Sequence, residues 1–140
     1  MEPSAEPTRL INAMRFLVEI PTNPSTEVFE LLAPNVTYTV PGRSPLAGVF
    51  HGPTEVRDHI NKLLRVTTGT FQILKWVEWL VGPTHVAALQ FAQAQGRSVI
   101  YRAHNLYLVE TDHDDLIVDI RVLFEDQYQT DRFFSQIDPE

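Results

Sequence analysis

The chain has 140 residues, a net charge of −7 and no cysteine. Its length fits one domain, and its acidic balance argues against a nucleic-acid partner, which would require a basic face. The lack of cysteine excludes disulfides, thiolate nucleophiles and cysteine-based zinc sites.

The N-terminal sequence MEPSAEPTR is acidic and contains proline, so we do not expect a signal peptide. No apolar run reaches the roughly 18 residues that a membrane span needs. We therefore expect a cytoplasmic protein with no membrane partner. It should form a single domain over residues 1–140, with its ordered core at about residues 7–135.

Helices are predicted in the first part of the chain. Apolar residues at helical spacing predict a helix over about residues 7–20. A second helix is expected after Asn23, which can cap it with Pro24 at its first position, and Pro34 closes it. The β-branched and aromatic run 36–40 then predicts a strand.

Residues 41–52 read PGRSPLAGVFHG, and their glycines and arginine raise the question of a phosphate-binding loop. A P-loop continues from glycine into lysine and serine or threonine, whereas Gly52 is followed by Pro53, which has no amide hydrogen. We therefore expect a corner between the first strand and a third helix. A third helix is predicted to start at Gly52-Pro53, with one face formed by Val56, His59, Ile60, Leu63 and Leu64.

Beyond Gly69 the pattern changes to strands. We expect them over residues 70–81, 84–95, 97–110 and 116–124, followed by a short helix over about 126–135. Helices followed by an antiparallel meander predict an α+β fold, with the helices on one face of a curved sheet. Both faces of the long strands carry apolar residues, so we expect the convex face to form a homodimer.

The order and spacing of several segments resemble the SnoaL-like and ketosteroid-isomerase-like members of the NTF2-like superfamily. These segments are the early helices, residues 32–38, residues 41–52, and the last strand 117–121 running on to 124–126. The resemblance implies a cystatin-like cone, in which N-terminal helices pack on a curved, mainly antiparallel sheet around an apolar pocket. Members include isomerases, cyclases, dehydratases, epoxide hydrolases and binding proteins, so the fold alone does not decide the function.

The resemblance also allows a search for the catalytic groups of the ketosteroid isomerases. Their tyrosine, their aspartate base and their buried protonated aspartate align by eye with Phe16, Val40 and His104. Two of the three groups are absent and the third has changed type. We therefore do not expect steroid isomerisation by that mechanism.

The same alignment implies a mostly apolar pocket with a few polar groups. Because histidine titrates near neutral pH, we predict His104 and His59 as the acid–base catalysts, with Arg102 or Gln90 stabilising an enolate oxygen. Bringing Gln90 beside Arg102 requires a bulge or a turn longer than two residues after Gln95. The predicted substrate-binding residues are Phe16, Tyr38, Val40, Gln90, Arg102, Leu106, Ile120, Val122 and Phe124.

Three functional hypotheses remain open. The first is an acid–base enzyme, a cyclase, isomerase or dehydratase, acting on a hydrophobic carbonyl or polycyclic substrate. The second is a non-catalytic module for hydrophobic ligand binding or dimerisation. The third, hydrolysis of the limonene-epoxide-hydrolase type, requires Asp119 and Arg121 to point into the pocket, whereas the expected register turns them outward. No hypothesis calls for a metal or another cofactor.

Overall fold

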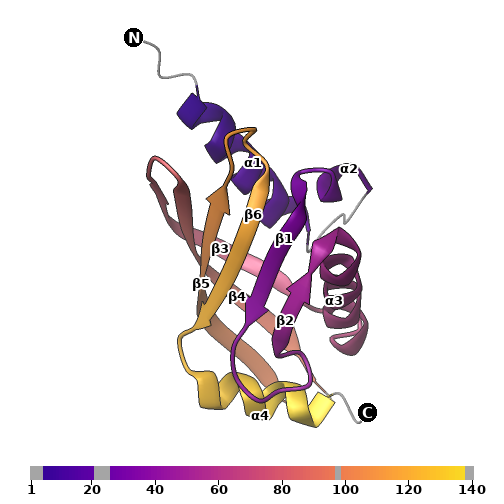
Figure 1. Cartoon of the computed structure of the whole chain (residues 1–140). Helices are drawn as coiled ribbons and strands as arrows, with labels where there is room; N and C mark the ends of the chain where they lie inside the picture. Colours follow the sequence, from indigo (N-terminus) through magenta and orange to yellow (C-terminus); the bar gives the residue numbers. More distant parts are fainter. Residues whose placement is uncertain (1–4, 21–25, 97–98, 138–140) are drawn as a thin grey trace.

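The computed structural model describes residues 5–20, 26–96 and 99–137 of the chain. In this part, four helices accompany one six-stranded sheet with the order β2-β1-β6-β5-β4-β3 (Figure 1). The helices are α1 (Ala5–Glu19), α2 (Thr26–Phe29), α3 (Gly52–Val66) and α4 (Gln127–Ile137). The strands are β1 (Leu32–Val40), β2 (Gly48–His51), β3 (Gln72–Val81), β4 (His85–Gln95), β5 (Ile100–Thr111) and β6 (Ile117–Phe124). The predicted α+β class is confirmed.

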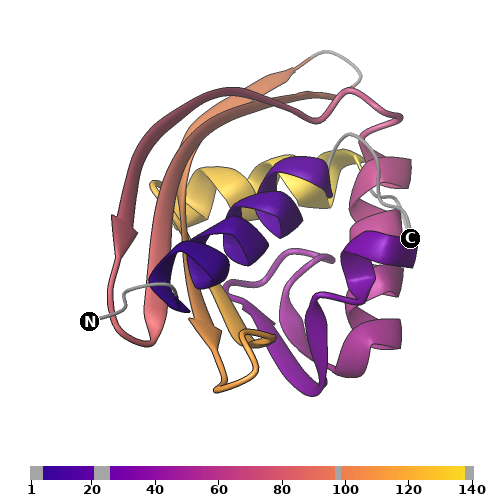
Figure 2. The same cartoon turned by 90° about the horizontal axis from the view of Figure 1, so that it is seen from above.

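The long strands β3 to β5 curve around α1 and α4, whereas α3 packs beside β1 and β2 (Figure 2). Apolar side chains from the helices and from the concave face of the sheet form two buried clusters. One cluster joins α1, α2 and α3 to the sheet. The other includes Tyr101 of β5 together with Phe133 and Phe134 of α4. The hydrophobic core therefore lies inside the curve of the sheet.

The second predicted helix is shorter than expected. α2 has only four residues, and its predicted cap Asn23 with Pro24 lies outside the described residues. β1 already begins at Leu32, which pairs with Ile117 of β6. The pairing register shifts between Leu32 and Thr37, an irregularity that accommodates Pro34, which cannot donate a ladder hydrogen bond.

The corner at residues 41–52 contains a strand that the sequence analysis did not predict. β2 pairs antiparallel with β1, and α3 starts at Gly52 as expected. Gly42 has a φ of 103°, and a Cβ atom there would overlap the side chains of Gln127 and Asp131 in α4. The Gln127 amide donates a hydrogen bond to the Pro41 carbonyl at 3.3 Å, so this corner rests on the last helix.

The register between β4 and β5 decides which side chains enter the interior. Gln95 pairs with Ile100, so four residues separate the strands and Gln90 lies opposite Asn105. Alternate β5 residues, among them Tyr101 and Asn105, are buried on the concave face. The expected register placed the other set inside, and that prediction is wrong by one residue, which exchanges the two faces of the strand.

Candidate functional site

The interior holds a cavity of about 30 Å³, and a second chamber of about 30 Å³ lies next to it. Both chambers are walled by Tyr38, Leu63, Phe71 and Tyr107, which therefore separate them. A space of roughly 10–15 Å³ is enough for one water molecule, whereas pockets for drug-sized ligands measure roughly 300–1,000 Å³. The cavity as it stands is too small for the polycyclic substrate considered from the sequence.

Two tyrosines stand at the wall between the chambers. Burial raises the pKa of Tyr38 well above its ordinary value, and the neighbouring Tyr107 raises it further. Burial likewise raises the pKa of Tyr107 to about 12, and its hydrogen bond with Tyr38 acts in the opposite sense. Both side chains therefore remain protonated at neutral pH, and each has a hydroxyl proton to donate.

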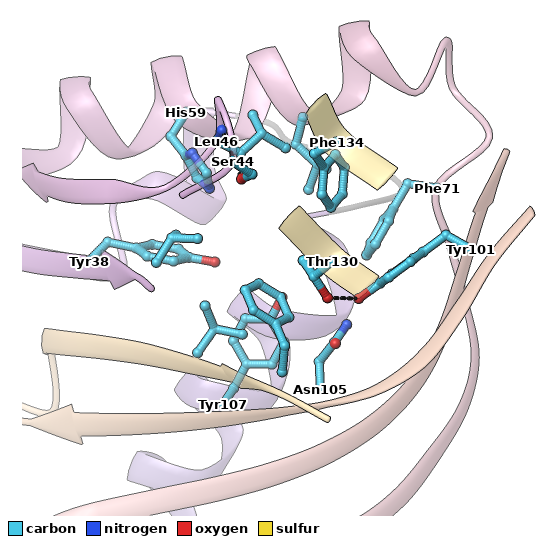
Figure 3. A pocket seen from close by; sticks show the side chains of 14 residues that line it. Tyr38, Ser44, Leu46, His59, Phe71, Tyr101, Asn105, Tyr107, Thr130 and Phe134 are labelled. Atoms are coloured by element: carbon cyan, nitrogen blue, oxygen red, sulfur yellow. Dashed lines mark hydrogen bonds between the residues drawn. The ribbon is translucent and has the colours of Figure 1, made fainter. Parts of the chain in front are cut away.

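His59, from α3, lines the first chamber next to Tyr38 (Figure 3). Its ring stacks on Phe50 at 4.5 Å between centroids and lies 5.3 Å from the ring of Tyr38. Burial, followed by the nearby positive charge of Lys62, lowers the pKa of His59 to about 4. The imidazole is therefore neutral at pH 7.

His59 also faces the outside of the cone. With Leu46 it lines an outer groove of about 250 Å³ between α3 and the corner at residues 41–52. The same two side chains line the first interior chamber. A wall of two side chains thus separates the cavity from the groove.

Two buried amide side chains on the neighbouring strands β4 and β5 form a hydrogen-bonded pair beside the cavity. Gln90 and Asn105 are each 2% exposed, and the Asn105 amide donates to Gln90 Oε1 at 3.1 Å. Asn105 lines the first chamber and Gln90 lines the second. Asn105 Oδ1 is the one buried side-chain polar atom in the described part of the chain that has no hydrogen-bond partner. Such an orphaned acceptor marks a position that a bound molecule can satisfy.

Tyr101, Thr130 and Ser44 provide the remaining hydroxyls of the first chamber. The Tyr101 and Thr130 hydroxyls lie 2.8 Å apart and form a hydrogen bond between β5 and α4, whereas the Ser44 hydroxyl accepts the Leu46 backbone amide hydrogen at 3.1 Å. Burial raises the pKa of Tyr101 to about 12, so this phenol also remains protonated. The polar lining of the chamber is therefore uncharged at pH 7.

Most of the substrate-binding residues predicted from the sequence do line the interior. Phe16 and Gln90 line the second chamber, whereas Val40, Val122 and Phe124 line the first chamber. Tyr38 is part of both. Ile120 is fully buried in the core beside them, but it lines neither chamber.

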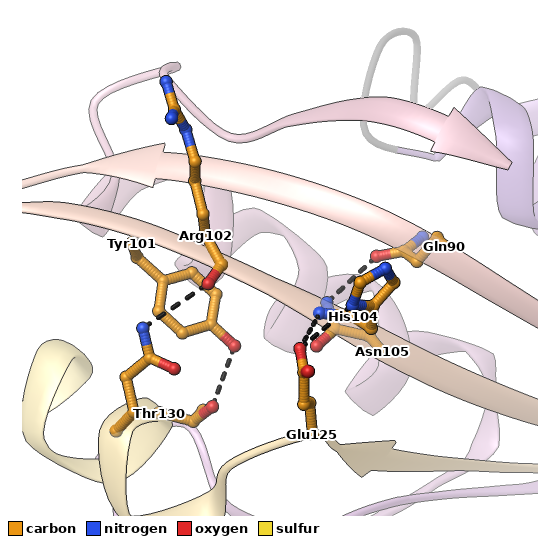
Figure 4. Close-up of polar contacts among 8 residues, drawn as sticks. Gln90, Tyr101, Arg102, His104, Asn105, Glu125 and Thr130 are labelled. Carbon is orange, nitrogen blue, oxygen red and sulfur yellow. Dashed lines mark hydrogen bonds and ion pairs between the residues drawn. The ribbon is translucent and has the colours of Figure 1, made fainter. Parts of the chain in front are cut away.

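His104 is not in the cavity, and its prediction as a pocket residue is wrong. Its side chain lies on the convex face, where Nδ1 is 3.0 Å from Glu125 Oε1 and the ring lies 4.8 Å from that of Phe91 (Figure 4). The same carboxylate accepts the backbone amide hydrogen of His104 at 2.9 Å. Both hydrogen bonds lower the pKa of Glu125, and the one from the backbone amide has the larger effect.

Arg102 and Leu106 share this outward orientation, because they alternate with the buried residues of β5. The Arg102 guanidinium donates to Gln93 Oε1 at 2.6 Å, and Leu106 lines a shallow surface hollow with His104. Asp119 and Arg121 form an ion pair at 3.1 Å, with 66% of the Arg121 side chain exposed. Neither residue lines the cavity, so this pair does not supply the arrangement that epoxide hydrolysis would require.

The sequence analysis missed Tyr101, Asn105 and Tyr107. A signal for them was present, since the set that alternates with them contains Arg102 and Glu110. Charged residues at every second position of a strand indicate that this set of side chains faces outward.

Within the described ranges, no group of three or more histidine, aspartate or glutamate side chains lies close enough to hold a metal ion. None of the helices in this part of the chain combines the length and the apolar character that a membrane crossing requires.

Comparison with known proteins identifies the fold. No family model and no curated protein matches the chain. Among solved structures, Bal32a from a soil-derived mobile gene cassette shares 20% identity, with 92% of this chain and 98% of that chain covered and a TM-score of 0.85. A protein with a cystatin-like fold from Xanthomonas campestris shares 24% identity over 90% and 97% of the two chains, with a TM-score of 0.82.

A SnoaL-like polyketide cyclase from Jannaschia sp. CCS1, described as putative, shares 10% identity over 96% of each chain, with a TM-score of 0.78. An NTF2-like protein from Burkholderia xenovorans shares 15% identity over 92% and 97% of the two chains, with a TM-score of 0.77. At these identities the comparisons establish the fold, and the expected cystatin-like cone is confirmed.

Proposed function

We propose that this chain, which has the NTF2-like fold, binds a small, uncharged and mostly apolar organic molecule in its interior cavity. The observation that carries the proposal is the protonation state of the polar lining. The pKa values of Tyr38 and Tyr107 lie above their ordinary value and that of His59 lies below it. At pH 7 the cavity therefore offers hydrogen bonds without a counter-ion, and a charged ligand would lose its hydration without compensation.

The size of the ligand follows from the partition between the chambers. Tyr38, Tyr107, Leu63 and Phe71 belong to both linings, so rotation of these side chains joins the two spaces. Because a cavity that binds benzene measures roughly 150 Å³ and each chamber only about 30 Å³, even a molecule of one aromatic ring requires these side chains to move aside. Another protein of this fold, TerC, has been co-crystallised with polyporic acid, at 12% identity and a TM-score of 0.76.

Acid–base catalysis at the same site is the second candidate, and the proximity of the Tyr38 and His59 rings favours it. A tyrosine hydroxyl donates to the substrate carbonyl oxygen, and neutral His59 removes a proton from the adjacent carbon. The electron pair of the broken C–H bond moves onto the oxygen, and the resulting enolate is stabilised by the hydroxyl. The lowered pKa of His59 makes it a weak base, so binding ranks first.

Native mass spectrometry and a panel of one-ring compounds test the binding proposal. The cavity-filling variant Val122→Leu should lose ligand affinity, whereas Val109→Leu, at a buried site outside both chambers, should retain it. Equal affinity of wild type and Val122→Leu would exclude the cavity as the site. For catalysis, wild type in D₂O should exchange the α-proton of a bound ketone and His59→Gln should not.

We also propose that the convex face forms a homodimer. Leu80, Ile100 and Leu123, from β3, β5 and β6, are 63%, 55% and 56% exposed. The described helices lie inside the curve or beside β1 and β2, so none covers β3 to β5 from outside (Figure 2). The face also carries charges of both signs, such as Arg121 and Asp119, so a second copy related by a two-fold axis can match it in charge.

A further inference from the structure

We propose that the ligand presents a hydrogen-bond donor to Asn105 Oδ1, which makes it a hydroxylated molecule of the phenol or enol type. This inference rests on the proposed binding function and specifies its ligand. Asn105 is 2% exposed and its Oδ1 atom has no partner within the described residues. A buried acceptor without a donor is costly, and a ligand that supplies the donor gains what the empty site lacks.

The orientation of the amide follows from its neighbour across the sheet. Gln90 Oε1 accepts a hydrogen bond from Asn105 Nδ2 at 3.1 Å, and Gln90 is itself 2% exposed. The nitrogen of the Asn105 amide is thus hydrogen-bonded to Gln90 in β4. The amide oxygen is left without a partner, and Asn105 is one of the residues that line the first chamber.

The nearby hydroxyls do not take this role. Those of Tyr101 and Thr130 hydrogen-bond to each other at 2.8 Å. The hydroxyls of Tyr38 and Tyr107 likewise interact with each other, which uses one of their two protons. The other proton is free to donate to an oxygen in the cavity.

A single ligand hydroxyl can donate a hydrogen bond to Asn105 and accept one from Tyr107. Asn105 and Tyr107 are two residues apart on the concave face of β5, so their side chains stand next to each other on the same side of the sheet. A hydroxyl oxygen between them accepts from the tyrosine and donates to the asparagine. A water molecule can occupy the same position in the empty cavity, and a phenol replaces it while burying its ring. A methyl ether of the same shape can accept but cannot donate.

The test compares phenol, anisole and toluene as ligands of the full chain. Dissociation constants come from chemical-shift titration, with the Asn105 side-chain amide resonances reporting the position of the bound ring. Wild type should bind phenol about tenfold more tightly than anisole. In Asn105→Leu, whose side chain has the same branching and the same number of heavy atoms, this preference should fall to less than about twofold.

Thr67→Val is the control, because it removes a buried hydroxyl that lines neither chamber and leaves Asn105 in place. It should keep the preference for phenol. If Asn105→Leu does not fold, the wild-type protein still decides the question. At saturation the Asn105 amide signals should shift further with phenol than with toluene, because only phenol donates to Oδ1.

The outcomes separate this inference from the proposed function. Equal affinity for phenol and anisole in wild type, or an unchanged preference in Asn105→Leu, would overturn the inference and leave cavity binding intact. Failure of all three compounds to bind would overturn the proposed function and the inference with it.

Discussion

Acidification should destabilise the folded protein through His59. The side chain is buried, 7% exposed, and burial lowers its pKa from 6.5 to about 4. The unfolded chain therefore binds a proton at a higher pH than the folded chain does. The stability that neutral His59 contributes is fully present above pH 6.5, decreases as the pH falls below that value, and levels off below about pH 4.

The magnitude follows from the two pKa values. Their difference, at about 1.36 kcal/mol for each pH unit, corresponds to about 3 kcal/mol in total. Between pH 7 and pH 5 the same linkage gives a loss of about 2 kcal/mol. This loss would be a large part of the stability of a small domain, which is roughly 5–15 kcal/mol.

Urea unfolding of wild type and His59→Gln at several pH values between 7 and 5 measures this contribution. The carboxylates and the other histidines titrate in both proteins, so the difference between the two pH dependences isolates His59. The wild type should lose about 2 kcal/mol more than the variant over this range. Parallel pH dependences would show that the buried imidazole does not have the lowered pKa from which the reasoning starts.

Three further experiments test the cavity, the corner at residues 41–52 and the convex face of the sheet. Val122→Leu should leave the free energy of unfolding within about 1 kcal/mol, because its extra methylene enters the cavity, whereas Val109→Leu should lower it by about 1–3 kcal/mol; equal losses in chemical denaturation would argue against the cavity. Gly42→Ala should lower the free energy of unfolding by about 1–3 kcal/mol in the same assay, because a φ of 103° disfavours a side chain and a Cβ atom there would meet α4. An unchanged free energy of unfolding would contradict this conformation of the corner. If the proposed homodimer forms through the convex face, Leu123→Glu should convert it to a monomer in analytical ultracentrifugation, and an unchanged sedimentation coefficient would exclude this face as the interface.

The local signals in the sequence predicted most of the elements. Gly52-Pro53 marks the start of α3, and the helical spacing of Val56, His59 and Ile60 correctly identifies its buried face. These predictions succeed because they depend on residues within one or two turns of each other. β2 was missed because four residues give too short a pattern, and because its pairing with β1 is a tertiary contact.

The site was harder to predict, because it depends on strand register. A shift of one residue along β5 exchanges Tyr101 and Asn105 for Arg102 and His104 on the concave face. The length of the β4–β5 connection sets that register, and the sequence around Gln95 did not specify it. The buried His59 could be identified from its helix face, but its lowered pKa arises from packing against residues distant in the chain.

The parallel pairing of β1 with β6 has a consequence for the order of folding. Residues 37–39 of β1 lie beside residues 119–121, about eighty positions later in the chain. Until β6 is in place, β1 has only the short β2 as a partner, and a two-stranded ribbon is marginally stable by itself. Closing such a long loop early is entropically unfavourable, and folding rates fall as the sequence separation of contacts grows. We therefore expect the docking of β6 on β1 to be a late step, so that a nascent chain cannot close its interior cavity until β6 has emerged.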